Sequence, residues 1–316
     1  MISGLSVGQV SDPVGLTGVT VLLPQRPAIG GVEIRGWAVG IHGLEFLDPR
    51  HLVPALDGVV LSGGSAFGLE TIWGVMQWLE ERGVGFRTSH TAIPHVAGAI
   101  LYDLGVGDHR RRPDRAMGYA AAAAARPGPV EEGNVGAGTG ATVGKLSGAR
   151  CAMKGGIGCA TVRVDDVELG ALVAVNAVGD VRDPETGRLI AGTRDAPDGR
   201  RLVDTAAALA AGAPPPAFRP VNTTIGVVAT TAALDKAGAA RLAAQAIEGF
   251  GLALSPPHLG ADGDALFAMS VGDASADSAL LGAAAARVVA RAIVRAVTMA
   301  TSLPGIPAAR DLASCS

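Results

Sequence analysis

Short apolar runs and longer stretches of amphipathic or alanine-rich sequence divide the chain. Apolar runs of four to eight residues bounded by turn-forming residues are typical of buried strands, whereas longer amphipathic stretches favour helices. The sequence therefore predicts strands at 18–23, 57–61, 97–104, 161–164 and 168–180. It predicts helices near 73–79, 117–125, 202–211, 231–250 and 278–301, the fourth capped by Thr231. The polar, proline-containing stretch 182–220 is predicted to be an exposed connection around the third of these helices.

The most informative change of pattern falls at Asn222. A proline-rich approach ends there, and a β-branched apolar run begins, which predicts a buried strand starting at Thr223. Thr223 has two interpretations: it is an ordinary first strand residue, or the backbone breaks after Asn222 and leaves it as a new N-terminus. An N-terminal threonine carries a nucleophilic hydroxyl and, in its α-amine with a pKa of about 7.7–8, a base.

A glycine-rich loop at 133–146 ends in Lys145. It departs from a nucleotide-binding loop, because Thr139 stands where the first glycine should be and Leu146 replaces the magnesium-binding Ser or Thr. The glycines instead indicate tightly packed backbone that turns Lys145 inward. Asn176 interrupts the apolar run at 168–180, so it is either a turn residue or an amide donor for a developing oxyanion.

Two acidic residues follow in the segment Asp262-Gly263-Asp264. If this segment is extended, the two carboxylates point to one face and repel each other unless a cation lies between them. Lys145 and an ammonium group at Thr223 would serve. The alternative is a turn with two solvated aspartates.

Composition narrows the class of protein. The chain has 316 residues, 48% hydrophobic but only 3% aromatic, so its core must be built from Ala, Val, Leu and Ile. A net charge of −3 gives no electrostatic case for nucleic acid. Cys151, Cys159 and Cys315 are an odd number without metal-site spacing, which disfavours a disulfide framework or a zinc site.

No signal peptide or membrane span is evident, which predicts a soluble cytoplasmic protein. Arginines at 287, 291 and 295 form a stripe that is solvated or faces another subunit.

Several motifs, in order along most of the chain, resemble the self-processing aminopeptidases. This family includes the L-aminopeptidase/D-amidase-D-esterases, the β-peptidyl aminopeptidases and the endo-type nylon-oligomer hydrolases, to which the Asn-Thr junction is most similar. The motifs that carry the resemblance are residues 16–21, 63–69, 74–76, 134–145, 154–158, 175–177, 222–224 and 262–264.

The resemblance implies a four-layer α/β/β/α sandwich, similar to N-terminal-nucleophile hydrolases but connected differently. It implies self-cleavage between Asn222 and Thr223 into fragments 1–222 and 223–316, which stay together around one core. Members commonly form tetramers of such pairs and need no metal or organic cofactor. The site residues carried over by matching motifs are Thr223 as nucleophile, Lys145, Asn176 on the oxyanion side, Tyr102 near the site, and the acidic pair Asp262 and Asp264.

The function implied is an amide hydrolase that acts through an acyl-enzyme on a small amide or peptide, with no nucleic acid or membrane partner. Two alternatives stay open: an acyl transferase like the ornithine acetyltransferases, whose junction is usually Ala-Thr-Met, and a non-catalytic binding protein of the same fold. Trp37 and Ile41 are bulky in a region where the family has a small-residue turn, so the substrate is left undetermined.

Overall fold

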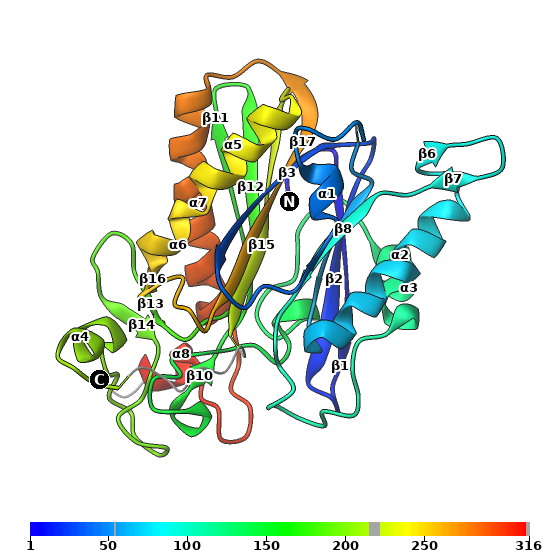
Figure 1. The fold of residues 1–316 in the computed structure, drawn as a ribbon. Helices are drawn as coiled ribbons and strands as arrows, with labels where there is room; N and C mark the ends of the chain where they lie inside the picture. The colour runs from blue at the N-terminus through cyan, green and yellow to red at the C-terminus, as the bar shows by residue number, and fades with distance from the viewer. Residues whose placement is uncertain (54, 215–221, 314–316) are drawn as a thin grey trace.

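Two five-stranded sheets pack face to face in the computed structural model, which describes residues 1–53, 55–214 and 222–313 (Figure 1). The first sheet has the order β1-β2-β5-β8-β4, formed by Leu5–Asp12, Thr17–Pro24, Gly58–Ser62, Val96–Ile100 and Ile41–His42. The second has the order β11-β12-β15-β17-β3, formed by Gly156–Val164, Val167–Asn176, Thr223–Ala232, Gly263–Ala274 and Ile29–Gly36. Neighbours are antiparallel except for the pairs β5–β8 and β15–β17, which are parallel.

Helices cover the outer face of each sheet (Figure 1). Over the first sheet lie α2 (Glu70–Glu80) and α3 (Arg115–Ala124). Over the second lie α5 (Lys236–Ala246), α6 (Glu248–Ala253) and α7 (Ser278–Thr298). The predicted α/β/β/α sandwich is therefore confirmed. The shorter elements are α1 (Leu44–Leu47), β6 (Phe86–Arg87), β7 (Ala92–Ile93), β9 (Thr142–Val143), β10 (Met153–Lys154), β13 (Asp180–Arg182), β14 (Leu189–Ala191), α4 (Thr205–Ala210), β16 (Leu254–Ser255) and α8 (Ala309–Ala313).

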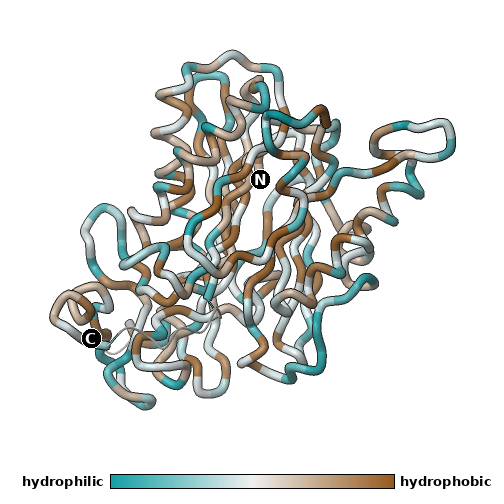
Figure 2. Tube along the Cα trace, in the orientation of Figure 1, coloured by the Kyte–Doolittle hydropathy of each residue, from teal (hydrophilic) through white to brown (hydrophobic). Residues whose placement is uncertain are grey.

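Three apolar layers separate the four layers of secondary structure. Leu61 of the first sheet and Ile225 and Phe267 of the second are fully buried between the sheets. The other two layers lie between each sheet and its helices. Figure 2 shows the most apolar segments along the inner strands and polar segments in the outer loops. Each fully buried side chain of this size stabilises the fold by about 1.5–3 kcal/mol, so aliphatic residues suffice despite the scarcity of aromatic ones.

The segments on either side of the Asn222–Thr223 bond interleave in the second sheet. Strands β15 and β17 follow this bond in the chain, and they lie between β12 and β3, which precede it. The two parts therefore share backbone hydrogen bonds and one core.

Three predicted boundaries are wrong. The strand predicted at 97–104 ends at Ile100, because the chain turns so that Asp103 accepts hydrogen bonds from the Thr17 hydroxyl and the Gly64 N–H. The strand predicted at 168–180 ends at Asn176. Thr231 lies inside β15, and the next helix is capped by Asp235, which accepts a hydrogen bond from Gly238 N at 2.6 Å.

The segment after Arg182 is more ordered than the prediction of an exposed connection. Asp180 is buried and accepts hydrogen bonds from the N–H groups of Thr193 and Thr205, which tie the segment to the second sheet's end. Residues 215–221, including most of the predicted proline-rich approach, and Cys315 lie outside the described residues. Within the described part of the chain, no helix combines the length and apolarity that a bilayer span requires.

Candidate active site

The Asn222–Thr223 bond lies at the start of β15, between the ends of β12 and β17. Thr223 pairs with Asn176 in the β12–β15 register, and Asn222 forms a parallel bridge with Asp262. Asn222 and Thr223 are each only 3% exposed. Sheet pairing thus brings together residues that are 47 and 40 positions apart in the sequence, and it encloses the bond.

Two hydrogen-bond donors converge on the carbonyl oxygen of Asn222. The Thr223 hydroxyl donates a short hydrogen bond to this oxygen, and Gly263 N donates another at 3.0 Å. Glycine is required at position 263, because a Cβ there would lie 2.1 Å from the carbonyl oxygen of Ala38. The hydroxyl and a backbone N–H therefore address the same peptide group.

Lys145 reaches this bond through Asn176. Its Nζ donates to the Asn176 carbonyl at 2.8 Å and to Asn176 Oδ1 at 2.9 Å. Asn176 Oδ1 also accepts from Thr142 N at 3.0 Å, and Asn176 Nδ2 donates to the carbonyl of Tyr102 at 2.9 Å. Asn176 is thus a buried member of β12 that orients the lysine rather than a turn residue, and the glycine-rich loop does turn Lys145 inward.

The two aspartates flank the same bond, and both are 1% exposed, so they are not the solvated turn of the alternative interpretation. Asp264 Oδ1 accepts from Thr224 N at 2.6 Å, and its Oδ2 lies 2.8 Å from His258 Nδ1. Asp262 accepts from Val178 N at 3.2 Å and from Leu259 N at 3.1 Å. Each carboxylate is therefore held by backbone N–H groups of neighbouring segments.

Burial shifts the ionisation of the charged groups in opposite directions. It raises the pKa of Asp262 to about 7, and the negative charge of Asp264 acts in the same direction. It lowers the pKa of Lys145 to about 7, and the charge of Asp262 opposes this shift. Burial therefore disfavours the charged form of both groups, and the opposite charges of Lys145 and Asp262 partly offset this effect.

Tyr102 is brought to the site as predicted, and the contact it makes is through its backbone. Its carbonyl accepts the hydrogen bond from Asn176 Nδ2. It follows the end of β8, so the first sheet contributes to a site otherwise built on the second.

Sequence reasoning missed His258 and Gly263. His258 precedes the acidic pair by only a few residues, and this proximity was the one available signal. The sequence does not reveal the role of Gly263, because a glycine between two aspartates is also typical of an ordinary turn.

Trp37 lies at the rim of the site. Its backbone N–H donates to the Asp262 carbonyl at 3.0 Å. Its indole ring covers Gly260, where a Cβ would lie 2.8 Å from the ring. The side chain is nevertheless 82% exposed. Trp37 therefore lies next to the acidic pair and presents its ring to solvent.

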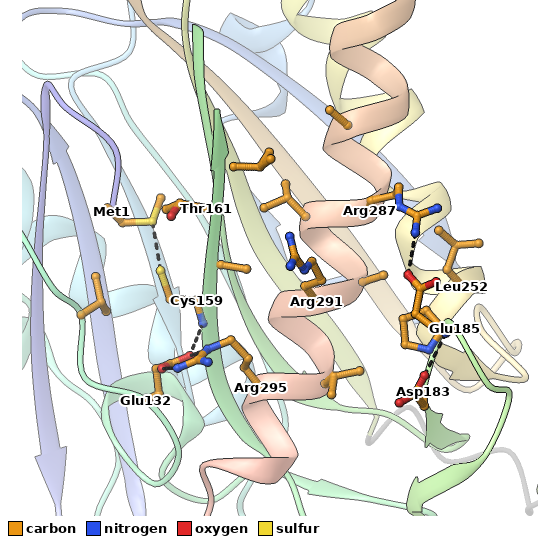
Figure 3. A pocket seen from close by; sticks show the side chains of 18 of the residues that line it. Met1, Glu132, Cys159, Thr161, Asp183, Glu185, Leu252, Arg287, Arg291 and Arg295 are labelled. Carbon is orange, nitrogen blue, oxygen red and sulfur yellow. Dashed lines mark hydrogen bonds and ion pairs between the residues drawn. The ribbon is translucent and has the colours of Figure 1, made fainter. Parts of the chain in front are cut away.

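A cavity of about 1190 Å³ lies elsewhere, between β11 and α7 (Figure 3). The predicted arginine stripe of 287, 291 and 295 lines it, and two of these residues pair with glutamates, Arg287 with Glu185 and Arg295 with Glu132. None of the residues predicted for catalysis lines this cavity.

Comparison with known proteins gives the family. Residues 2–310 match the model of peptidase family S58. The chain belongs to peptidase family S58. The resemblance to self-processing aminopeptidases is therefore confirmed, and the chain is a hydrolase acting on peptide or amide bonds rather than an acyl transferase.

Similar members of the family carry two kinds of name. An uncharacterized aminopeptidase of Mycobacterium tuberculosis is 39% identical over 320 residues, covering 93% of this chain and 89% of the relative. A 6-aminohexanoate-oligomer endohydrolase of a Kocuria species is 34% identical over 270 residues, covering 84% of this chain and 73% of the relative.

Among solved structures, the L-aminopeptidase D-Ala-esterase/amidase of Ochrobactrum anthropi superimposes with a TM-score of 0.73 at 21% identity. The superposition covers 99% of this chain and 90% of that one. That structure is described as a variant of the N-terminal-nucleophile hydrolase fold. The fold expected for this S58 peptidase is the one observed.

Proposed function

We propose that this S58 peptidase cleaves its own backbone between Asn222 and Thr223 and then hydrolyses amides with Thr223 as an N-terminal nucleophile. The observation that carries the proposal is the convergence of the Thr223 hydroxyl and Gly263 N–H on the Asn222 carbonyl oxygen. The Thr223 hydroxyl is positioned beside the carbonyl carbon that it attacks. The Gly263 N–H donates a hydrogen bond to the carbonyl oxygen, which becomes negatively charged during the attack.

The self-cleavage step moves the Asn222 acyl group from nitrogen to oxygen. Thr223 Oγ1 bonds to the Asn222 carbonyl carbon, the C–N bond to Thr223 breaks, and the hydroxyl proton ends on the departing amine. Gly263 N–H holds the tetrahedral oxyanion, a contribution of about 3 kcal/mol for one such donor. Water then hydrolyses the ester, leaving a carboxylate at Asn222 and both functional groups free on Thr223.

In the mature enzyme the Thr223 amine accepts the hydroxyl proton as Oγ1 attacks a substrate amide. Lys145 supplies a positive charge near Asp262. Asn176 accepts a hydrogen bond from Lys145 and is paired with the nucleophile Thr223 in the sheet register. Asp264 fixes the Thr224 N–H and thereby the backbone that carries the nucleophile. Asn176 is assigned to the oxyanion side, and the acyl-enzyme is hydrolysed by water.

The products of cleavage, 1–222 and 223–316, remain associated because β15 and β17 lie between β12 and β3. Separating them would expose both faces of the central strands. We further propose that the pair assembles into a tetramer, as the family resemblance implies, and that the enzyme acts in the cytoplasm.

The substrate is a linear amide or short peptide. In support, one relative is named an aminopeptidase and another a 6-aminohexanoate-oligomer endohydrolase. The exposed Trp37 ring beside Asp262 favours an apolar segment next to the scissile amide.

Denaturing intact-mass spectrometry of the purified protein tests the proposal, with Thr223→Val and Thr223→Ser as a matched pair. Valine keeps the branched shape without the hydroxyl, so it should remain a single uncleaved chain without amidase activity. Serine keeps the hydroxyl and should cleave. Wild type that stays intact on long incubation, or an uncleaved Thr223→Val protein with amidase activity, would overturn the scheme.

A further inference from the structure

His258 connects the buried acidic pair to solvent. Its side chain is 23% exposed, whereas that of its partner Asp264 is 1% exposed. The distance from His258 Nδ1 to Asp264 Oδ2 is 2.8 Å. Asp262, Asp264, Asn222 and Thr223 are all nearly inaccessible, whereas His258, which contacts Asp264 directly, is partly exposed.

The local structure fixes the imidazole firmly. His258 has a φ of 53°, a left-handed conformation that is uncommon outside glycine and for which His and Asn are enriched. Its ring stacks on Phe250 of α6, with centroids 5.6 Å apart and planes at 22°. An unusual backbone conformation and a stacked ring together aim Nδ1 at Asp264.

Asp264 passes this contact on to the nucleophile's own backbone. Its other oxygen accepts the hydrogen bond from Thr224 N, and Thr224 directly follows Thr223. In the uncleaved chain Thr223 is also held through Asn222. After the proposed cleavage that covalent tether is lost, so the remaining anchors of Thr223 are the β12 pairing and the Asp264 contact.

The other positively charged groups near Asp264 interact with other carboxylates. Lys145 acts on Asp262. Arg35 is opposite Asp264 in the β3–β17 register, but its guanidinium pairs with Glu33 and with Glu248 of α6. His258 is therefore the cation-forming group that Asp264 contacts directly in the described structure.

We propose that His258 is a positioning residue that donates Nδ1–H to Asp264, holds that carboxylate in its orientation, and so keeps Thr223 in place for turnover after cleavage. The inference rests on the proposed function. A neutral His258 still donates Nδ1–H, but only the imidazolium also contributes a positive charge. Its effect is therefore greatest at low pH and decreases as the imidazole loses its proton.

Two substitutions separate the hydrogen bond from the charge. His258→Gly accepts the positive φ and removes the donor, whereas His258→Asn also accepts this φ and retains an N–H donor without charge. We expect His258→Gly to self-cleave to completion, since the Gly263 and Thr223 contacts to Asn222 are unchanged. Its kcat should fall at least about 10-fold with little change in KM, and added imidazole should restore part of it.

For His258→Asn we expect kcat below wild type at low pH, with the two pH profiles converging as the pH rises. Equal kcat for His258→Gly and wild type, or a constant ratio of wild type to His258→Asn across pH, would overturn the inference. Wild type that neither self-cleaves nor hydrolyses amides would instead overturn the proposed function. If His258→Gly does not fold, the pH ratio of His258→Asn still decides the question.

Discussion

Two lysines, Lys145 and Lys154, have pKa values that are lowered to the same extent, but they have different hydrogen-bond partners. Burial lowers the pKa of both Lys145 and Lys154 to about 7, and each is opposed by the charge of one aspartate, Asp262 for the first and Asp103 for the second. Burial raises the pKa of those aspartates as well, to about 7 and about 6 respectively. Ionisation shifts alone do not distinguish the two pairs.

Their hydrogen bonds do distinguish them. Lys154 Nζ donates to three backbone carbonyls, those of Gly138, Ala141 and Gly155, at 2.9, 2.8 and 3.2 Å. All three ammonium donors are thereby used, and Asp103 is tied to Thr17 and Gly64. Lys154 clamps the glycine-rich loop that leads to Thr142 and Lys145.

Lys145 instead bonds to Asn176, the residue opposite Thr223, and it is partly exposed. A perturbed pKa marks a functional candidate only when the group also faces a reacting bond. The hydrogen bonds of Lys154 indicate a structural role, whereas those of Lys145 support the catalytic role that we propose for it.

The largest effect expected is on the stability of the Lys154 clamp. Lys154→Met leaves three buried carbonyl oxygens without their hydrogen-bond donor. At about 1–3 kcal/mol for each unsatisfied group, the free energy of unfolding should fall by about 3 kcal/mol or more. Denaturant unfolding with Lys145→Met as the matched control measures it. A larger loss of stability in Lys145→Met would break the comparison.

Amidase activity should depend more on Lys145 than on Lys154, the reverse of the order expected for stability. Lys145→Met removes the charge beside Asp262, and we expect amidase activity to fall at least about 100-fold, equivalent to about 2.7 kcal/mol in the barrier. The folded fraction should stay close to wild type, as circular dichroism would report. Full amidase activity in this variant would remove Lys145 from the mechanism.

The pH dependence of stability sharpens the distinction. Between pH 7 and the ordinary lysine pKa of 10.5, the unfolded chain binds a proton at Lys154 that the folded chain has lost. Stability therefore rises with pH across this window, by up to about 1.4 kcal/mol per pH unit for one proton. Unfolding measured at pH 7 and pH 9 should show a smaller rise in Lys154→Met than in wild type; an equal rise would contradict the shift.

The smallest effect expected concerns the rim of the site. Trp37→Ala should raise KM severalfold for substrates with an apolar segment and leave kcat nearly unchanged, because the side chain is largely exposed. Phe86→Ala is the control, since this exposed aromatic lies on the β6–β7 hairpin that projects from the body (Figure 1). Equal KM changes in the two variants would deny Trp37 a specific role.

The sequence predicted much of the site because its residues change the local pattern. Thr223 opens an apolar run, Asn176 interrupts one, and Lys145 closes a glycine-rich loop. Boundaries that depend on distant partners were not predictable. Strand β8 ends where Asp103 meets Thr17 and Gly64, and the helix cap at Asp235 follows a strand longer than its apolar run indicates.

By itself, the sequence determined the aliphatic core, most of the strands and helices, and a family whose motifs name the candidate nucleophile. These depend on local pattern and on residue identity, which the chain carries directly. Only the tertiary structure decided which of two buried lysines bonds to Asn176, that Gly263 N–H donates to the Asn222 carbonyl, and that His258 contacts Asp264. Such contacts join residues from separate strands and loops, and sheet register and packing alone bring them within hydrogen-bond distance.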